Sequence, residues 1–271
     1  MKNINTILDL DILSKIESEK LPLLTFKDWL NKFKQNLKYR YLPFRLYHHI
    51  RCYKYAKYRN PELKLISTLV TKDQASIDVG ANLGLFTSFM SKESAHVYAF
   101  EPNPYPLENL RGLVDKNVTI LPIALGNINE RTEIRIPHHE NGWSSNGASL
   151  ARSEEDNGKL ISIECRKLDS LNIQNIGLIK IDVEGFEIEV LKGAEKIIAR
   201  DKPNMIIENE EVHTKDTNEL FRVMNDYGYD KYICNADGDL EKIEEYSVRD
   251  NQKDAKIKDI NYIQNFIFIA R

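Results

Sequence analysis

"GLIKIDVEGFEIEVLKG", residues 177 to 193, begins like a buried strand, but Lys180, Asp182 and Glu184 interrupt its apolar run just before a glycine. Two carboxylates at a strand end are costly to remove from water unless a partner compensates them. The helical pattern that follows makes this segment a strand–turn–helix unit. We therefore expect these carboxylates to face a ligand, a metal ion or water.

Strands alternate with helices on both sides of this unit, which is typical of a parallel sheet covered by helices on both faces. The expected strands cover residues 75–79, 96–101, 118–125, 177–183, 203–208, 229–234 and 265–270, and the expected helices cover 62–70, 84–93, 105–116, 187–200 and 217–228. Two amphipathic strands interrupt the alternation and predict a β-hairpin inserted at about 130–170. The sequence thus predicts an α/β fold with a mostly parallel, seven-stranded sheet whose last strand is antiparallel.

A basic helical module at residues 1–61 is expected to precede the main domain at 62–271. Residues 31–60 contain nine Lys or Arg and six Tyr but no acid. Such a segment could bind acidic lipid headgroups, a phosphate-bearing acceptor or nucleic acid. Alternatively, its tyrosines pack on the main domain while its lysines stay in water.

The composition is that of an ordinary globular protein, with 42% hydrophobic and 29% charged residues. Its apolar runs are too short to span a membrane, and the polar N-terminus does not resemble a signal peptide. Cys52, Cys165 and Cys234 are far apart and odd in number, which suits reduced thiols. We expect a cytoplasmic protein, with residues 31–60 as the candidate for contact with a membrane surface.

Carboxylates follow four of the expected strands. They are Asp78, Glu101, Asp182 with Glu184, and Glu208 with Glu210. Ligands of open α/β sheets bind outside the carboxyl ends of the strands. An acidic rim suits a positively charged ligand, hydroxyl groups that donate hydrogen bonds, or a metal ion. Asp182 and Glu208 are the candidate ligands for a divalent metal, although no metal-binding spacing of His or Cys accompanies them.

The turn after the first strand has glycines where a ligand could approach the backbone. "IDVGANLG", residues 77–84, places Gly80 and Gly84 in a D-x-G-x-x-x-G pattern, which is not the G-x-G-x-x-G fingerprint of dinucleotide sites. Glu101 closes the next strand, where an acid can accept hydrogen bonds from two ribose hydroxyls. The turn and the acid together predict a nucleoside-containing cofactor, and the alternative is a tight turn without a ligand.

Several motifs resemble the FkbM-type methyltransferases, which are O-methyltransferases that depend on S-adenosylmethionine. The most specific are "DVGAN" at 78–82 and "KIDVEG" at 180–185, and "VYAFEPNP", "ILPIALGN", "PNMIIENEE" and "NFIFIA" accompany them in the family's order. The resemblance covers roughly residues 62–271 and implies the Rossmann-like fold of class I methyltransferases. It also implies an acceptor hydroxyl on a sugar, a surface glycan or a secondary metabolite.

The resemblance also implies cofactor contacts at particular positions. The family's methionine-binding turn falls on residues 78–87. Glu101 falls on the ribose-binding acid, and Asp182 would face the methyl group. The implied cofactor-binding residues are Asp78, Gly80, Ala81, Asn82, Gly84, Thr87, Glu101, Pro102, Asn103, Ala124 and Asp182. S-adenosylmethionine carries a sulfonium, an ammonium and two ribose hydroxyls, which agrees with an acidic rim.

Methyl transfer to a hydroxyl group needs alignment of the oxygen and a base that removes its proton. The candidates are Glu184, Asp182, Glu208 and His213, with Glu184 as the first choice. Alternatively, Glu184 accepts backbone N–H bonds where the helix begins near Gly185.

Two other functions stay open at this point. One is a nucleic-acid methyltransferase that uses the basic N-terminal segment, and the other is a protein that binds S-adenosylmethionine without turnover. The fourth strand ends in "IDVEG" and lacks the N/D-P-P-Y/F sequence that amino-methylating nucleic-acid enzymes generally carry there. This difference favours O-methylation.

Overall fold

The computed structural model describes most of the chain after residue 51. The described residues are 52–56, 60–113, 115–136, 138–139, 142–143, 159–214, 216–235, 237–254 and 262–271. Most of the predicted basic module, including nearly all of residues 31–60, lies outside them, so the division into two domains stays a prediction. Helical residues 52–56 bury Cys52 and Ala56, and Ala56 packs in one hydrophobic cluster with Leu63.

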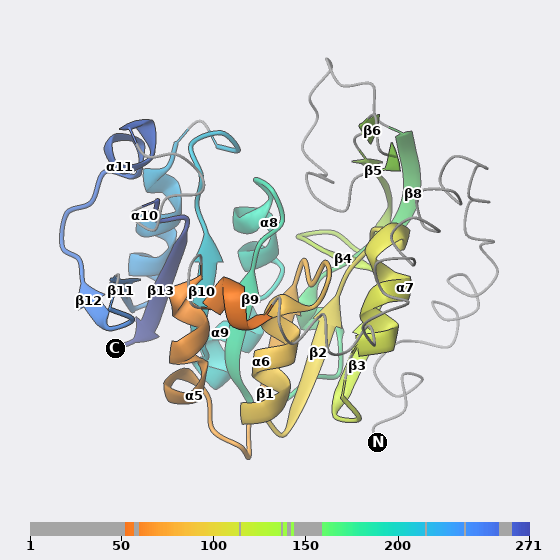
Figure 1. Cartoon of the computed structure of the whole chain (residues 1–271), viewed down its shortest axis with the longest axis horizontal. Helices are drawn as coiled ribbons and strands as arrows, with labels where there is room; N and C mark the ends of the chain where they lie inside the picture. Colours follow the sequence, from red (N-terminus) through yellow and green to blue (C-terminus); the bar gives the residue numbers. More distant parts are fainter. Residues whose placement is uncertain are drawn as a thin grey trace.

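A twisted, eight-stranded sheet forms the centre of the molecule (Figure 1). Its strand order is β12-β11-β13-β10-β9-β1-β2-β3. The strands are β1 (Ala75–Val79), β2 (His96–Phe100), β3 (Val118–Leu121), β9 (Ile176–Ile181), β10 (Asn204–Glu208), β11 (Tyr229–Cys234), β12 (Leu240–Lys242) and β13 (Asn265–Ala270). Strands β3, β2, β1, β9 and β10 are paired in parallel, whereas β13 is antiparallel to β10 and β11.

The predicted α/β fold with an antiparallel last strand is therefore confirmed, and β12 is an addition to it. This three-residue strand pairs with β11 at the edge of the sheet, and its residues are largely exposed. A short exposed strand buries too little apolar surface to leave a periodic pattern in the sequence.

Helices cover both faces of the sheet (Figure 1). One face carries a 3-10 helix, η1 (Pro61–Leu65), followed by α5 (Ile66–Leu69), α6 (Leu85–Glu93) and α7 (Pro104–Leu113), and the other carries α8 (Glu187–Lys192), α9 (Glu195–Asp201) and α10 (Asn218–Asp226). Helix α11 (Val248–Asp254) precedes the last strand. Side chains of the central strands alternate between the faces, so Leu178 packs in the cluster of α5 and α6 while Ile179 packs in that of α8 to α10.

The single helix predicted at 187–200 is divided into α8 and α9 at Gly193. A Cβ atom at Gly193 would lie 1.9 Å from the carbonyl oxygen of Gly126, so the chain passes too close there for any side chain. Asp169 accepts hydrogen bonds from the N–H groups of Lys196 at 2.9 Å and Ile197 at 3.0 Å in the first turn of α9. Contacts distant in sequence therefore end one helix and start the next, and the prediction of one helix is wrong.

The predicted hairpin is present as β5 (Glu130–Ile136) and β8 (Lys159–Arg166), which pair in antiparallel register. The expected strand at 118–125 is two strands, because β4 (Ala124–Leu125) leaves the main sheet and pairs with β8. A second small pair, β6 (His138–His139) and β7 (Gly142–Trp143), extends from the hairpin, and a 3-10 helix, η2 (Leu168–Ser170), follows it. Through β4, the inserted sheet forms one wall of the cavity described next.

In the described part of the chain, no helix combines the length and apolar character needed to cross a lipid bilayer.

Candidate active site

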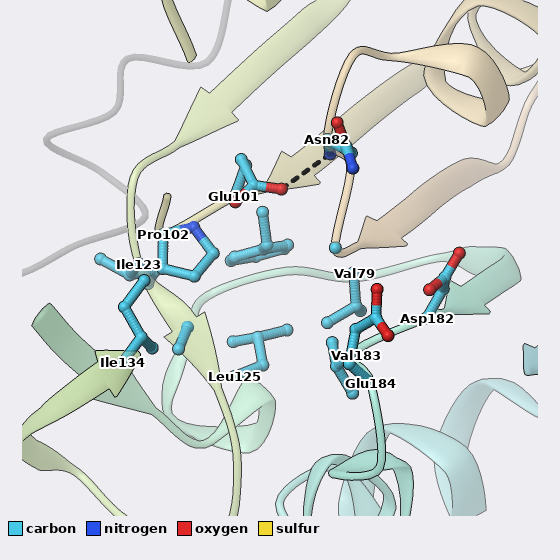
Figure 2. Close-up of a pocket in the computed structure, with 13 residues that line it drawn as sticks. Val79, Asn82, Glu101, Pro102, Ile123, Leu125, Ile134, Asp182, Val183 and Glu184 are labelled. Carbon is cyan, nitrogen blue, oxygen red and sulfur yellow. Dashed lines mark hydrogen bonds between the residues drawn. The ribbon is translucent and has the colours of Figure 1, made fainter. Parts of the chain in front are cut away.

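A cavity of about 670 Å³, counted with its open mouth, lies at the carboxyl ends of β1, β2 and β9 (Figure 2). Its apolar walls come from Phe100, Ile123, Leu125 and Ile134, and its polar groups come from Asn82, Glu101, Asp182 and Glu184. An apolar recess with a few converging polar groups is the usual form of a cofactor site. The position agrees with the rule that open α/β sheets bind ligands at the strand ends.

Glu101 joins the two turns on one side of this cavity. Glu101 is only 6% exposed. One carboxylate oxygen accepts the N–H of Asn82 at 2.7 Å, and the other accepts the N–H of Asn103 at 2.7 Å. Burial, assisted by nearby Asp78, raises the pKa of Glu101 to about 7 despite these two hydrogen bonds. Each oxygen keeps a second lone pair, with which it can accept a ligand hydroxyl.

The glycine turn brings β1 against the loop after β9. Gly80 has a φ of +78°, and a Cβ atom there would lie 1.9 Å from the carbonyl oxygen of Asp182. Below the turn, Asp78 is completely buried, and its Oδ2 accepts the hydroxyl of Thr87 at 2.5 Å. Its Oδ1 has no hydrogen-bond partner among the described residues. A buried carboxylate oxygen without a donor is rare and points to a missing partner.

These residues fit S-adenosylmethionine. The apolar walls suit a nucleobase, Glu101 can accept ribose hydroxyls, and the close turn at Gly80 leaves backbone next to the cavity. Of the predicted cofactor residues, those that line the cavity are Gly80, Asn82, Glu101, Pro102, Ala124 and Asp182. The others, Asp78, Ala81, Gly84, Thr87 and Asn103, do not line it, and several of them shape the turn from behind.

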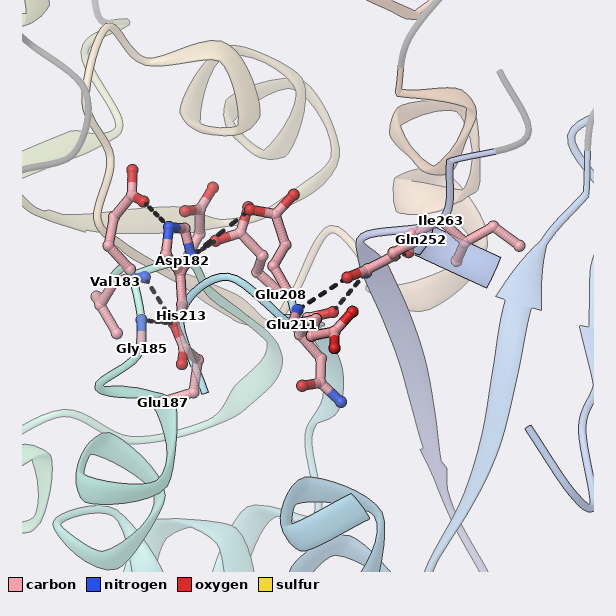
Figure 3. A network of polar contacts seen from close by, with 12 residues as sticks. Asp182, Val183, Gly185, Glu187, Glu208, Glu211, His213, Gln252 and Ile263 are labelled. Carbon is pink, nitrogen blue, oxygen red and sulfur yellow. Dashed lines mark hydrogen bonds and ion pairs between the residues drawn. The ribbon is translucent and has the colours of Figure 1, made fainter. Parts of the chain in front are cut away.

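Four carboxylates and a histidine lie close together at the same edge of the sheet, and we call Asp182, Glu184, Glu208, Glu210 and His213 the rim cluster (Figure 3). Asp182 and Glu184 line the cavity described above, whereas Glu208, Glu210 and His213 line a neighbouring one. The Nε2 atom of His213 lies 2.9 Å from Glu184 Oε2, and its Nδ1 lies 3.5 Å from Glu210 Oε2 and 4.0 Å from Glu208 Oε2. The hydrogen bond with Glu184 raises the pKa of His213, and the nearby Glu210 adds to the effect. The structure thus brings together all four residues predicted as catalytic.

Glu184 has an uncommon backbone conformation within the rim cluster. Its φ is +56°, in the left-handed region that residues other than glycine rarely adopt. The N–H groups of Val183 and Gly185 donate to Glu187 Oε1, both at 3.1 Å, and α8 begins at Glu187. The capping role considered for Glu184 therefore belongs to Glu187, while Glu184 contacts His213.

Sequence reasoning missed Glu187 as a structural residue of the site. The available signal was an acid at the start of a helix, where carboxylates commonly accept backbone N–H groups. Both Glu184 and Glu187 could have accepted these N–H groups. Glu184 instead contacts His213, which is distant in the sequence, and Glu187 accepts them.

Buried Gln252 of α11 holds the loop that carries the acids of β10 in place (Figure 3). Its Oε1 accepts the N–H of Glu211 at 2.8 Å, and its Nε2 donates to the carbonyls of Asn209 and Ile263, both at 2.9 Å. A fully satisfied buried amide restricts the loop to one conformation. The position of Glu210 and Glu208 therefore depends on a segment more than forty residues away in sequence.

Lys180 is a cation buried beneath the site, at 2% exposure. Its Nζ lies 2.7 Å from Asp182 Oδ2 and 4.9 Å from the centre of the Phe86 ring, and Asp78 faces it in the strand register. Burial alone would lower the pKa of Lys180, but Asp182 and Asp78 outweigh burial and raise it. Lys180 therefore compensates carboxylates that would otherwise be buried without a counter-charge.

The Asp182 and Glu208 pair considered as a metal site gains no support. Asp182 is already bound by Lys180. Among the described residues, the possible ligand atoms that lie within 4.8 Å of one another belong to Glu184, Glu208 and His213.

Binding of S-adenosylhomocysteine is expected to weaken as the pH falls through 7. Protonation of Glu101, whose pKa lies at about 7, removes a charged acceptor for the ribose hydroxyls. Calorimetric affinity should be about tenfold lower at about pH 6 than at about pH 8. Glu101→Gln should bind weakly and with little dependence on pH, and equal wild-type affinity at both pH values would contradict this role for Glu101.

The family model described as "Methyltransferase FkbM domain" matches residues 78–231. The hexuronic acid methyltransferase AglP of Haloferax volcanii is 30% identical over 133 residues, which are 48% of this chain and 54% of that protein. The methyltransferase sdnD of Sordaria araneosa is 25% identical over 155 residues, which are 44% of this chain and 60% of that protein. The chain thus spans little more than half the length of these relatives.

Comparison with solved structures gives matches of low TM-score to other methyltransferases. A methyltransferase FkbM from Methylobacillus flagellatus KT has a TM-score of 0.46 at 18% identity, with 75% of this chain and 47% of that chain covered. A methyltransferase from Streptococcus mutans in complex with SAH has a TM-score of 0.43 at 12% identity, with 78% and 96% covered. Because the family model matches more than half of its length, the chain belongs to the FkbM methyltransferase domain family.

Proposed function

We propose that this protein transfers a methyl group from S-adenosylmethionine to a hydroxyl group of a sugar, a surface glycan or a secondary metabolite. The observation that carries the proposal is the position of Glu184, which lines the cofactor cavity and lies 2.9 Å from His213. Membership of the FkbM family supports methyl transfer. The name of one relative, a hexuronic acid methyltransferase, supports a sugar as acceptor.

The cofactor supplies an electrophilic methyl group when it is bound. Glu101 would accept the ribose hydroxyls, the backbone of the turn at Gly80 would adjoin the methionyl part, and Ala124 and Leu125 would border the base. Asp182, held by Lys180, presents a negative charge to the positive end of the ligand. These residues bind and orient the donor, and alignment of the reacting atoms accounts for much of the rate of such a displacement.

Glu184 is the proposed base that takes the proton of the acceptor hydroxyl. His213 fixes the Glu184 carboxylate and shares the proton once the hydroxyl has lost it. The pair can accept this proton only when His213 is neutral. Below the raised pKa of His213 the imidazole is already protonated, so activity should be lost as the pH falls through that pKa. Glu208 and Glu210, on the other side of the imidazole, would contact further hydroxyl groups of the acceptor.

The two alternative functions are less well supported by the described residues. Four carboxylates at the rim would repel a nucleic-acid backbone, and the basic segment on which that alternative depends lies mostly outside the described residues. A protein that binds the cofactor without turnover needs no hydrogen-bonded Glu184 and His213 pair beside the cavity.

Calorimetry with S-adenosylmethionine and a transfer assay with methyl-labelled cofactor test the proposal. We expect saturable binding with one site per chain and labelled product with cell-derived glycan or metabolite fractions treated with the protein. The absence of cofactor binding would contradict any methyltransferase function. Cofactor binding without transfer to any acceptor fraction would favour the non-catalytic alternative.

A further inference from the structure

Glu208 is buried in the rim cluster without a hydrogen-bond donor. The residue is 7% exposed, and its carboxylate accepts no hydrogen bond from any residue that the structure describes. Its one recorded ion pair joins Oε2 to His213 Nδ1 at 4.0 Å, which is beyond hydrogen-bond distance. The Glu208 side chain lines a cavity and is largely, though not fully, removed from water. A carboxylate with so little hydration and no donor is costly, so this group is suited to a partner that supplies one.

The surroundings of Glu208 are negatively charged. Burial first, and then the neighbouring carboxylates of Asp182, Glu210 and Glu184, raise its pKa well above the usual value. Among the described residues, the cations paired with the rim cluster are Lys180, which binds Asp182, and His213, which binds Glu184. Four carboxylates thus face two cations, and no recorded ion pair within the described part of the chain joins an arginine or another lysine to the rim cluster.

We propose that the rim cluster binds the part of the acceptor around its reacting hydroxyl, and that it selects neutral or cationic sugars over acidic ones through Glu208. A hydroxyl or ammonium group of the acceptor would donate to the Glu208 carboxylate. A carboxylate or phosphate in that place would lie among four acids, of which Asp182 is paired with Lys180 and Glu184 with His213. This inference rests on the proposed function for the identity of the site. It departs from the hexuronic acid named for one relative.

The preference for neutral or cationic sugars over acidic ones can be measured with three glycosides that differ in one group. We would titrate the protein, saturated with S-adenosylhomocysteine, with methyl glucosaminide, methyl glucoside and methyl glucuronide by ligand-observed NMR. We expect the glucuronide to bind at least about tenfold more weakly than the glucosaminide. The ammonium group of the glucosaminide donates to Glu208 and favours its ionised carboxylate, whereas the carboxylate of the glucuronide is repelled by the acids of the rim cluster. Added salt should reduce this preference in the wild-type protein.

Two matched variants locate the preference. Glu208→Gln keeps the shape but removes the charge, and should reduce the discrimination between glucosaminide and glucuronide about tenfold. Glu211→Gln removes a nearby acid that binds Arg249 at 2.6 Å, and should leave the discrimination unchanged. Thermal unfolding of each variant verifies folding, and the salt dependence of the wild type tests the charge preference if Glu208→Gln fails to fold.

Three results would overturn the proposal: a glucuronide that binds as tightly as the glucosaminide, a discrimination that survives in Glu208→Gln, or no binding of any glycoside to the wild type. Calorimetry with S-adenosylmethionine on the same samples separates this failure from that of the proposed function. If the cofactor binds while the order of the glycoside affinities is reversed, the proposal of methyl transfer is retained and the proposal of charge selection is rejected. If the cofactor does not bind, the methyltransferase proposal fails, whatever the order of the glycosides.

Discussion

Glu184→Gln should lose turnover by about 10²- to 10⁴-fold, which is the usual contribution of a positioned general base. Glutamine keeps the length and hydrogen-bonding shape of the side chain but cannot take a proton from the acceptor. Because Glu184 lies at the edge of the cavity and not beside Glu101, affinity for S-adenosylhomocysteine should change little. Single-turnover assays with labelled cofactor, combined with calorimetry, measure the two effects separately.

Glu211→Gln is the control for this substitution, since Glu211 is an acid of the nearby loop that binds Arg249. Its turnover should stay close to that of the wild type. The pH profile adds a second readout: wild-type turnover should fall as the pH decreases below the raised pKa of His213, and His213→Gln should move this limit to lower pH. Full activity in Glu184→Gln would remove Glu184 as the base.

Lys180→Met should destabilise the fold by about 3 kcal/mol at neutral pH, because removing one partner of a buried ion pair leaves the other charge without compensation. The Lys180 side chain is 3% exposed, whereas that of Asp182 is 31% exposed and can recover some hydration, which places the loss at the lower end of the usual range. For a domain of this size, the melting temperature should fall by roughly 6 to 12 °C.

The loss in Lys180→Met should depend on pH in a defined direction. Burial already raises the pKa of Asp78 although Lys180 opposes this effect, and without Lys180 the folded-state pKa of Asp78 should rise further, so protonation at low pH favours the folded state. The deficit should therefore be largest above this pKa and should shrink as the pH falls.

Lys192→Met, which removes an exposed ion pair with Glu189 at 2.6 Å, should change stability by less than about 1 kcal/mol. Denaturant unfolding at two pH values measures both variants. An equal loss at acidic and neutral pH in Lys180→Met would show that lost packing on Phe86, and not charge, explains the effect.

The sequence predicted most of what local chemistry determines. The alternation of strand and helix patterns predicted the sheet, and the strand-end acids with the glycine turn at Gly80 predicted where the cavity lies. Hydrophobic periodicity and turn chemistry are local properties of the sequence, so these features could be predicted. The partners of those acids were not predictable in the same way. Glu187 in place of Glu184 as the N–H acceptor, Lys180 as the partner of Asp182, and Gln252 as the support of the loop at 209–211 all depend on how distant segments pack.

The same limit explains the errors in the elements. The break at Gly193 results from the approach of Gly126, which precedes it by 67 residues, and the edge strand β12 exists because β11 offers unpaired backbone groups. Neither cause appears in the pattern of the segment itself. His213 was identified as a candidate only because its loop follows β10, and its contact with Glu184 needed the fold.

The left-handed backbone at Glu184 makes this position one where stability and activity are opposed. Glycine would adopt a φ of +56° without strain, whereas a longer residue there costs of order 1 kcal/mol. A chain selected only for stability would therefore lose its carboxylate at this turn. That a glutamate occupies it suggests that the protein tolerates a local penalty in order to present an acid group beside its cofactor cavity.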